Sequence, residues 1–506
     1  MTRTLDRKTT RILLSVMSAA FALSVIGCAA VGPDYAPPET ALPDSWHTTL
    51  DRGLSHHPAD AESVALWWER FEDPVLTHLI EGALGGSPDI QEAVARVQEA
   101  RARRGLSRTD LYPSLDATGN AAFSGEIENE VKETSLGAGQ GDEGTIRQFS
   151  AGLDAGWELD LFGGVRRTLE AAEADLQATR ADLRDAWVTL AAETALTYIE
   201  VRTSQVRLAV ARANLEAQQE TLALTSARRD AGLESELAVH QARYSVESTR
   251  ARIPSLESGL ETALNGLAVL QGRAPGTLHS ILDDIGIVPT PAKDVAVGIP
   301  ADVLRQRPDI RSAERELAAQ TARIGEATAD LYPKVRISGS IGVETLDLNH
   351  LGTTAVWPFG YGISIEWPVF DAGRIRRNID VQKALQEQAM ARYKGAVLSA
   401  LEEVENALSA YALERDRLDT LHRAASAAQE AVDLAQIQYE AGLIDFGDVL
   451  EAQRSLLGFQ DEVAESEGTV AADVVRLYKA LGGGWQAMTW TEGLEENPPS
   501  TEEKQG

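Results

Sequence analysis

An α+β fold, in which a tandem duplication supplies four β-strands and several very long α-helices, is predicted by three observations on this 506-residue chain. The first is that short stretches of sequence from the first half recur in the same order in the second half. The second is a pair of very long segments with almost no glycine or proline. The third is a set of four short segments in which apolar and polar residues alternate.

The duplication is a feature of the whole chain, and internal repeats decide the fold before any single element does. Matching stretches are offset by 220 positions near the start of each half and by 210 later, so the first half carries an insertion. The matching stretches are PDI at 88–90 and 308–310, DLYP at 110–113 and 330–333, and AGL at 231–233 and 441–443.

The two longest segments are each predicted to form one helix. Neither glycine nor proline occurs in residues 165–231, and a single glycine occurs in residues 374–441. Both segments are dominated by residues that lose little conformational freedom in a helix. A helix of this length reaches roughly 100 Å, which exceeds any globular core. Gly232 and Gly442 are expected to end these helices, and Pro254 is expected to kink or interrupt the helix that returns.

Four segments are predicted to be half-buried strands, because their apolar residues fall at every second position. This alternation alone suits the face of a soluble sandwich as well as a membrane barrel. Trp157 and Trp367 lie near strand ends, where membrane barrels carry aromatic girdles, and the long acidic connection 125–148 resembles an extracellular loop. These features favour a membrane barrel. The predicted strands are 114–124, 149–161, 334–345 and 359–369.

Four strands are too few to close a barrel, since the smallest closed barrels have about eight. Open edges cannot face lipid, because each unpaired backbone amide costs several kcal/mol there. Several chains must therefore pool their strands: two would supply eight, and three would supply twelve with room for a lumen. The long helices need neighbours for the same reason, because a single chain cannot bury their apolar stripes.

The N-terminus has the features of an export signal. Four basic residues precede an apolar stretch at 12–26, which is too short for a membrane-spanning helix. The stretch leads to Cys28, the only cysteine, so an internal disulfide or a cysteine-rich metal site is excluded. Cys28 could be a passive residue within a conventional signal, but the segment resembles a bacterial lipoprotein box. That resemblance implies a lipid on Cys28, and Ala29 is not the aspartate that retains lipoproteins at the inner membrane.

The charge of the chain excludes one class of partner. A formal net charge of −30 argues against nucleic acid, whose phosphates require a basic surface. Any lumen that such a chain encloses should prefer cations.

The chain resembles the TolC-like outer-membrane factor family, in particular the NodT-type lipoproteins that form the outer-membrane subunit of efflux pumps. The resemblance extends over residues 28 to 485 and rests on four motifs. These are CAAVGPDYAPP at 28–38, WW at 67–68 followed by Phe71, Asp73, Pro74 and Leu76, RPDI at 307–310 after Leu304, and YEAG at 439–442 followed by EAQR at 451–454.

The resemblance implies a homotrimer with a twelve-stranded β-barrel and an α-helical periplasmic tunnel, anchored in the outer membrane. It implies an exit duct that passes small molecules such as drugs, working with a periplasmic adaptor (membrane-fusion) protein and an inner-membrane pump. No cofactor is expected besides the covalent lipid at Cys28. The predicted divisions are a signal peptide (1–27), a lipidated leader with an equatorial segment (28–87), a first repeat (88–271), an equatorial linker (272–307), a second repeat (308–485) and an acidic tail (486–506).

The candidate site is the periplasmic aperture at the tips of the two helical hairpins. Asp445, Asp448 and Glu451 follow the second turn at three-residue spacing, which places them near one stripe of a helix. Glu234 and Glu236 follow the first turn. A threefold axis would turn each carboxylate into a ring. The alternative is a solvent-facing acidic helix start, which the helix dipole favours without any pore.

The resemblance also assigns roles near the second turn. It matches Glu451 with an aperture carboxylate and Tyr439 with a tyrosine beside the same constriction. The chain departs from the family at Gln438, where relatives often have arginine, and at Gly447, where a bulky leucine can close the pore. Closure by an apolar plug at that level is therefore not expected.

Catalysis and metal binding are not expected. The chain has no HExxH, GxSxG or phosphate-loop motif, and its histidines, including His56-His57 and His240, are interpreted as solvated. One alternative is a periplasmic coiled-coil scaffold or adaptor lipoprotein anchored by Cys28, and another is an exported enzyme. The four alternating strands and the duplication argue against the scaffold, and the missing motifs argue against the enzyme.

Overall fold

The structure is a computed structural model of the chain, and it divides into two compact units. The sheet unit comprises Met1–Pro38, Gln98–Ala178 and Glu314–Arg392, and the helical unit comprises Glu39–Val97, Thr179–Ala313 and Tyr393–Gly506. The predicted signal peptide, Cys28, His56-His57, most of the connection 125–148 and nearly all of the acidic tail lie outside the described residues. The described residues are 30–39, 42–50, 54–55, 64–124, 146–289, 295–346 and 356–486.

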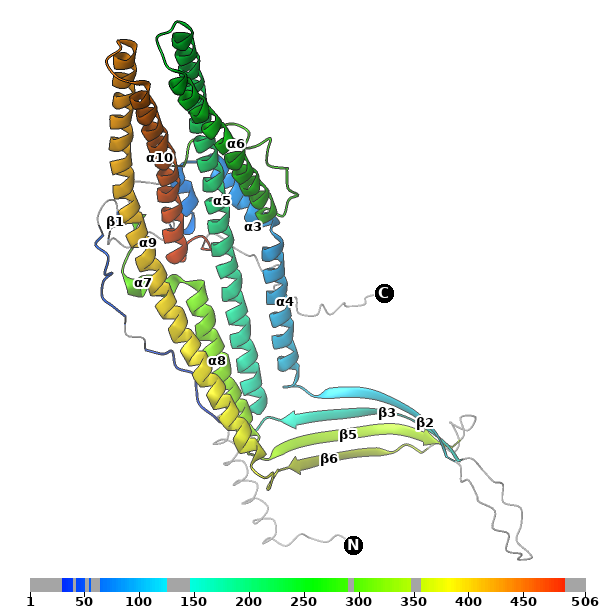
Figure 1. Cartoon of the computed structure of the whole chain (residues 1–506). Coiled ribbons are helices and arrows are strands. Elements are labelled where there is room, and N and C mark those ends of the chain that lie inside the picture. The colour runs from blue at the N-terminus through cyan, green and yellow to red at the C-terminus, as the bar shows by residue number, and fades with distance from the viewer. Residues whose placement is uncertain are drawn as a thin grey trace, which may run out of the picture. The chain divides into compact units, whose positions relative to one another are not determined.

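The sheet unit contains one four-stranded antiparallel sheet (Figure 1). Each repeat supplies one hairpin, and the pairing of β3 with β5 joins the two hairpins. The outer strands β2 and β6 each have a single partner in the sheet. The strands lie in the order β2 (Ser114–Ser124), β3 (Ile146–Leu159), β5 (Lys334–Thr345) and β6 (Phe359–Glu366).

The register gives the sheet one apolar and one polar face. Trp157, Ile337 and Ile363 form one cross-strand row over β3, β5 and β6. The neighbouring rows, with glutamate, arginine and serine side chains, point to the opposite face, because successive residues of a strand alternate. Ile363 and Ile365 on β6 are 70% and 69% exposed. The alternation expected from the sequence is therefore present, and the apolar face has no cover within the chain's described part.

Two predicted strands have different ends in the structure. The strand expected at 149–161 starts at Ile146, where pairing with β2 begins, and stops at Leu159. The next residue, Asp160, leaves the strand because its carboxylate accepts the backbone N–H groups of Val165 and Arg166, at 3.2 and 2.9 Å. The strand expected at 359–369 stops at Glu366, close to Pro368, which has no N–H to donate to a ladder.

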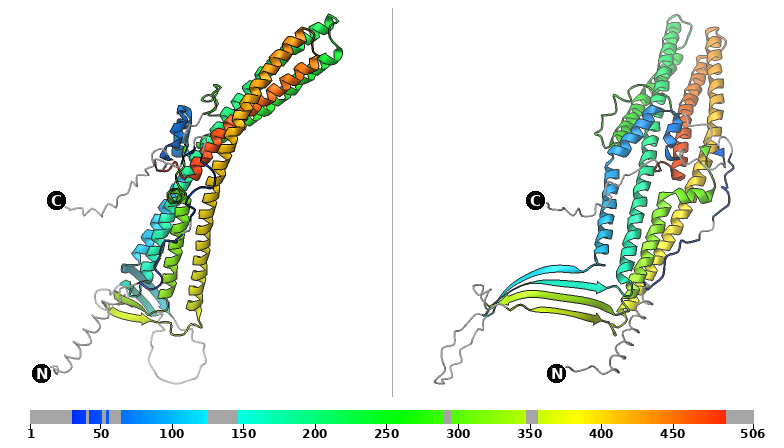
Figure 2. Two further views of the ribbon diagram at one scale, coloured as in Figure 1. Left: turned by 90° about the vertical axis from the view of Figure 1, so that its left-hand side faces the viewer. Right: turned by 180° about the vertical axis from the view of Figure 1, so that it is seen from behind.

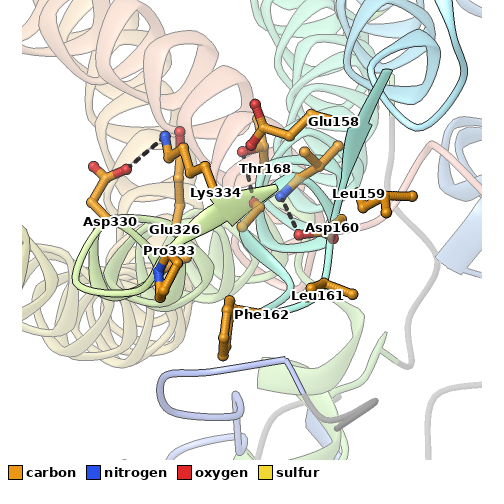
Figure 3. A pocket seen from close by; sticks show the side chains of 13 residues that line it. Glu158, Leu159, Asp160, Leu161, Phe162, Thr168, Glu326, Asp330, Pro333 and Lys334 are labelled. Carbon is orange, nitrogen blue, oxygen red and sulfur yellow. Dashed lines mark hydrogen bonds and ion pairs between the residues drawn. The ribbon is translucent and has the colours of Figure 1, made fainter. Parts of the chain in front are cut away.

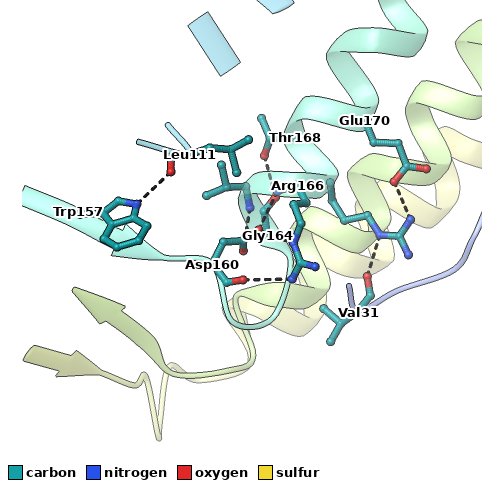
Figure 4. Close-up of polar contacts among 10 residues, drawn as sticks. Val31, Leu111, Trp157, Asp160, Gly164, Arg166, Thr168 and Glu170 are labelled. Carbon is teal, nitrogen blue, oxygen red and sulfur yellow. Dashed lines mark hydrogen bonds and ion pairs between the residues drawn. The ribbon is translucent and has the colours of Figure 1, made fainter. Parts of the chain in front are cut away.

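A tryptophan closes each strand hairpin onto the preceding helix end. The indole of Trp157 in β3 donates to the carbonyl of Leu111 at 3.0 Å (Figure 4). Trp367, directly after β6, donates in the same way to the carbonyl of Leu331 at 3.1 Å. The two contacts occupy equivalent places in the two repeats, so each repeat ties its second strand to the turn that starts its first strand.

The long helices have equal lengths in the two repeats. α5 (Gly164–Asp230) and α9 (Arg374–Glu440) have 67 residues each, and the returning helices α6 (Glu236–Leu270) and α10 (Phe446–Ala480) have 35 each. In Figure 2 each returning helix runs back beside the second part of its partner. α6 continues through Pro254, so the expected interruption there was wrong. Within the residues described, no helix is both long and apolar enough to cross a membrane.

Shorter elements surround the repeats. The helices that open the two repeats, α4 and α8, have 22 residues each. In the helical unit, β1 of the leader pairs in parallel with β4 between the repeats. The remaining elements are β1 (Leu54–Ser55), η1 (Trp67–Phe71), α3 (Pro74–Gly86), α4 (Pro88–Thr109), β4 (Val295–Ala296), α7 (Pro300–Gln306) and α8 (Pro308–Ala329).

The main hydrophobic core lies in the helical unit and includes the leader. Trp67 is fully buried and stacks on Tyr478 of α10, with ring centroids 5.7 Å apart. Asp73 caps α3 by accepting the N–H of Val75 at 2.8 Å, and it also accepts the hydroxyl of Tyr198 at 2.7 Å. The leader motif thus holds α5 and α10 together at the base of the hairpins, which fixes where their tips can lie.

Candidate functional site

The turns at the two hairpin tips share one backbone geometry. Gly232 and Gly442 have φ of 73° and 72°, the left-handed conformation in which glycine pays no steric penalty. Leu233 and Leu443 each donate their N–H to the carbonyl five residues earlier, at 2.8 and 2.9 Å. Such bonds satisfy the last carbonyls of a helix in a Schellman motif. Both glycines end their helices as expected, and the two leucines are exposed at the turns.

At the first tip the acidic side chains have partners. Glu236 forms an ion pair with Arg229 across the turn, at 2.9 Å. The hydrogen bond from Arg229, together with its charge, lowers the pKa of Glu236 from its ordinary value. Ser235 caps α6 by accepting the N–H of Ala238 at 3.2 Å. At the first turn the charge of Glu236 is therefore balanced by Arg229, and the start of α6 is capped by Ser235.

Glu234 instead joins the first tip to the second. The hydroxyl of Tyr439, near the end of α9, donates to Glu234 at 2.7 Å. The guanidinium of Arg228 lies over the Tyr439 ring, 4.5 Å from its centroid. Tyr439 is buried, and burial followed by the Glu234 carboxylate raises the pKa of Tyr439 to about 12. This tyrosine therefore stays protonated and can donate to Glu234 throughout the physiological range.

A small apolar cluster lies beneath this contact. Phe446, the first residue of α10, is buried and packs against Tyr439, with ring centroids 5.5 Å apart. Farther from the tips, polar side chains continue the contact between α5 and α10. The cluster comprises Ala238, Ala242, Tyr439, Phe446, Val449 and Leu450. The polar contacts are Gln453 to Thr221 at 3.0 Å, Asn214 to Gln460 at 2.8 Å and Arg207 to Asp461 at 2.7 Å.

At the second tip the acidic side chains are exposed and have no partner among the described residues. Asp445 precedes the first residue of α10, but its side chain makes no capping hydrogen bond. Asp448 and Glu451 lie on the same exposed side of α10. A Cβ placed on Gly447 would meet no heavy atom within 4 Å. The expected row of acidic side chains is therefore present on this chain, and the space beside Gly447 is open.

The structure adds residues that sequence reasoning did not single out. Arg228 and Phe446 connect the two tips and Arg229 closes the first turn onto Glu236, yet only Phe446 carried a signal in the sequence. It occupies the position that Glu236 has in the first repeat, so an apolar residue there indicated a buried contact. Arg228 gave no signal, because its contact with Tyr439 depends on how the two hairpins pack.

The sheet unit contains a separate cavity of about 300 Å³ at the junction of β3, β5 and the start of α5 (Figure 3). Its lining includes Asp160, which caps α5, and Asp330, whose carboxylate pairs with Lys334 at 2.9 Å. These charges serve local structure. In the described ranges no three His, Cys, Asp or Glu side chains are grouped so that they could hold a metal ion.

A long helical hairpin and a pair of strands in each repeat, with the four strands joined in one antiparallel sheet, define the TolC-like class of outer-membrane channels. The chain matches the model of the outer membrane efflux protein family over residues 79–273 and 299–483. It is 34% identical over 469 residues to nodulation protein T of Rhizobium leguminosarum bv. trifolii, covering 92% of this chain and 97% of that protein. It is 30% identical over 466 residues to the cation efflux system protein CusC of Escherichia coli K12, covering 92% and 98%.

A solved structure supports the same family assignment. The outer-membrane channel OprN superposes with a TM-score of 0.82 at 36% identity, covering 90% of this chain and 100% of that chain. The chain therefore belongs to the outer membrane efflux protein family. It is the outer-membrane channel of an efflux pump, a transport protein and not an enzyme. The family, function and outer-membrane location expected from the sequence are confirmed.

Proposed function

We propose that three copies of this chain form a lipid-anchored duct, in which twelve strands close a barrel and the hairpin tips form the periplasmic mouth. The observation that carries this proposal is the sheet, whose apolar face is exposed and whose edges β2 and β6 have no second partner in the sheet. Lipid cannot satisfy unpaired backbone groups, so β6 of one copy must pair with β2 of the next. Two copies would leave no lumen, and three leave one.

The helices support the same assembly. α9 carries exposed apolar side chains along much of its length, and contact with a neighbouring copy would bury them. The helices of three copies would then continue the barrel as a periplasmic tunnel. The exposed apolar residues of α9 are Val381, Leu385, Leu398, Leu413, Leu434 and Ile437.

The N-terminus and the partners complete the proposal. A signal peptide ending at residue 27 leaves Cys28 as the lipid-bearing first residue, which anchors the chain in the outer membrane in addition to the barrel. The tips, with Leu233 and Leu443 exposed, face a periplasmic adaptor and through it an inner-membrane pump. Small molecules such as drugs would leave through this duct. The division of the chain into leader, two repeats, equatorial linker and tail stays a prediction.

At the mouth, the free acids of the second tip are the proposed aperture residues. Asp448 and Glu451 from three copies would surround the opening with six carboxylates. Like charges about 8 Å apart repel by about 0.5 kcal/mol in water and by more in a confined pore. The Tyr439–Glu234 contact, at 2.7 Å, opposes this repulsion by holding the two hairpins of each copy together. The ring would attract cations to the mouth.

A pair of substitutions on β6 tests the assembly. Ile365→Arg places a charge on the apolar face, which costs about 2–4 kcal/mol at the membrane midplane and less towards the interfaces. Ser364→Arg places the same side chain on the polar face and serves as the matched control. The heat-modifiable oligomer in outer-membrane fractions should be depleted only by Ile365→Arg. Equal amounts of oligomer in both variants would refute the barrel.

A further inference from the structure

Residues 30–35, the leader strap, are held tightly to the sheet unit although they form no regular helix or strand. Val31 donates its N–H to the carbonyl of Phe162 at 3.0 Å, beside the turn between β3 and α5. At the other end of the strap, the hydroxyl of Tyr35 donates to Glu314 of α8 at 2.9 Å. The strap is therefore attached at both ends.

Arg167 in the first turn of α5 binds the middle of the strap. Its side chain is only 4% exposed, and its guanidinium donates to the carbonyls of Val31 and Gly32 at 3.1 and 3.5 Å. It also pairs with Asp34 and Glu170, each at 2.7 Å. Two of these acceptors are backbone carbonyls, so Arg167 recognises the path of the strap and not only its side chains.

Two glycines allow the strap to lie this close to α8 and to the turn before α5. Gly32 has φ of 93°, and a Cβ there would lie 2.4 Å from the Cα of Gly325 on α8. Gly163 has φ of 80°, and a Cβ there would lie 2.4 Å from Ala30. Real Cβ atoms cannot approach so closely, so these contacts exist only with glycine at both positions.

The second repeat supplies a natural comparison. Arg377 and Asp380 of α9 occupy the positions that Arg167 and Glu170 have in α5, and they form the same ion pair three residues apart, at 3.2 Å. Among the described residues no equivalent strap covers them, and the side chain of Arg377 is 86% exposed. The burial of Arg167 is thus due to the strap and to α8, where a Cβ on Gly325 would lie 2.8 Å from the Arg167 side chain, and not to the position of the arginine in its own helix.

We propose that the strap is a docking site that fixes where the lipid of Cys28 enters the membrane, with Arg167 as the positioning residue. This inference rests on the proposed lipidation. Consecutive Cα atoms are about 3.8 Å apart, so the chain between Cys28 and the docked Ala30 has a reach of only about 8 Å. A flexible ten-residue tether would instead have a typical end-to-end distance of roughly 17 Å. The docked strap would thus keep the lipid anchor on a short tether to the sheet unit, which aids insertion of the sheet.

The test compares Arg167→Met with Arg377→Met in the full-length protein in its outer membrane. Detachment of the strap should make the bond after Tyr35 more accessible to chymotrypsin, because Tyr35 is half-buried in the docked strap. Loss of charge-assisted hydrogen bonds in Arg167→Met should raise the rate of this cleavage at least about tenfold, as measured by mass spectrometry. Arg377→Met should leave it unchanged. Gly32→Ala releases the strap without altering α5 and should reproduce the effect; unchanged cleavage in both releasing variants would overturn the docking site.

A second measurement separates positioning of the lipid from simple packing. Each variant is also made without the lipid, by replacing residues 1–28 with a conventionally cleaved export signal. In pulse–chase labelling, Arg167→Met should slow formation of the heat-modifiable oligomer in the lipidated protein and have no effect in the unlipidated one. Equal slowing in both forms would overturn the positioning role. An unacylated wild-type N-terminus would instead refute the lipid anchor itself. The chymotrypsin assay would still test whether the strap docks through Arg167.

Discussion

The two hairpin tips have the same backbone and different chemistry. Both turns place a glycine at φ near 72° and form the same closing hydrogen bonds, and the helices that follow are equal in length. Five consecutive positions after the shared Ala-Gly-Leu distinguish them. The first tip has Glu234, Ser235, Glu236, Leu237 and Ala238 where the second has Ile444, Asp445, Phe446, Gly447 and Asp448. The duplication preserved the geometry, while substitutions at these five positions gave each tip its own chemistry.

The first tip is stabilised by charge pairing, and the second by an apolar anchor. Glu236 is satisfied by Arg229, whereas Phe446 is buried against Tyr439. At the second tip Asp445 makes no capping hydrogen bond, and the acids have no partner among the described residues. In the proposed duct, free carboxylates can act on ions in the lumen, whereas carboxylates already paired with arginine act on them much less. Four variants test this difference between the tips, in order of decreasing expected effect.

Phe446→Ala should have the largest effect. Truncating a buried phenylalanine costs about 3–5 kcal/mol through lost packing and the cavity left behind. Hydrogen exchange of the amides in the first turns of α10 should therefore accelerate strongly. Glu236→Ala, the equivalent change in the first repeat, removes only an exposed ion pair and should leave exchange in α6 nearly unchanged. Similar acceleration in both tips would show that they are held by the same forces.

Tyr439→Phe should loosen the contact between the tips by about 1.5–3 kcal/mol, the range for a hydrogen bond to a charged group. The pKa of Tyr439 is raised from 10.0 to about 12, so the folded state keeps the proton longer than the unfolded one. The stability that depends on this proton is complete below pH 10 and declines above it, by about 1 kcal/mol at pH 11.

The melting temperature of the wild type should accordingly fall between about pH 10 and pH 12, and Tyr439→Phe should reduce that fall. Tyr244→Phe is the control, because Tyr244 is half-exposed on α6. The same alkaline dependence in wild type and Tyr439→Phe would exclude this hydroxyl as its source.

Asp448→Asn with Glu451→Gln should reduce the selectivity of the channel for cations over anions in planar bilayers and weaken any block by divalent ions. Each interaction between neighbouring carboxylates is worth only about 0.5 kcal/mol in water, so the change should be moderate. The swap Asp448→Glu with Glu451→Asp keeps the charge and should keep the selectivity. Unchanged selectivity in the neutral double variant would mean that these acids only solvate the tip.

Gly447→Leu should have the smallest effect on stability, because the site is open and leucine favours a helix over glycine by about 1 kcal/mol or less. It makes the second tip resemble the first, which has the exposed Leu237 at this position. Single-channel conductance should fall as the added side chain narrows the mouth. Conductance equal to that of the wild type would show that Gly447 does not line the opening.

Much of the fold was predictable because the duplication shows the sequence pattern of each helix and strand twice. The long helices differ from their expected limits by at most one residue at either end, and two strands agree at both ends. The errors in strand limits occur where a local contact ends a strand although apolar and polar residues continue to alternate. Asp160, for example, leaves β3 to cap α5. The acids of the second tip were also predictable. The contact between Tyr439 and Glu234, 205 positions apart, was not, because it depends on how two hairpins pack.

The tryptophan contacts at the sheet have an implication for how the protein evolved. Trp157 and Trp367 bind equivalent carbonyls in the two repeats, so the simplest account is that this bond existed before the gene was duplicated. The ancestor would then have been a chain of half this length, with one strand hairpin already tied to its helix. Six such chains would supply the twelve strands that the proposed assembly draws from three duplicated chains. In that assembly, duplication halves the number of subunits that must meet and leaves one tip of every pair free to change.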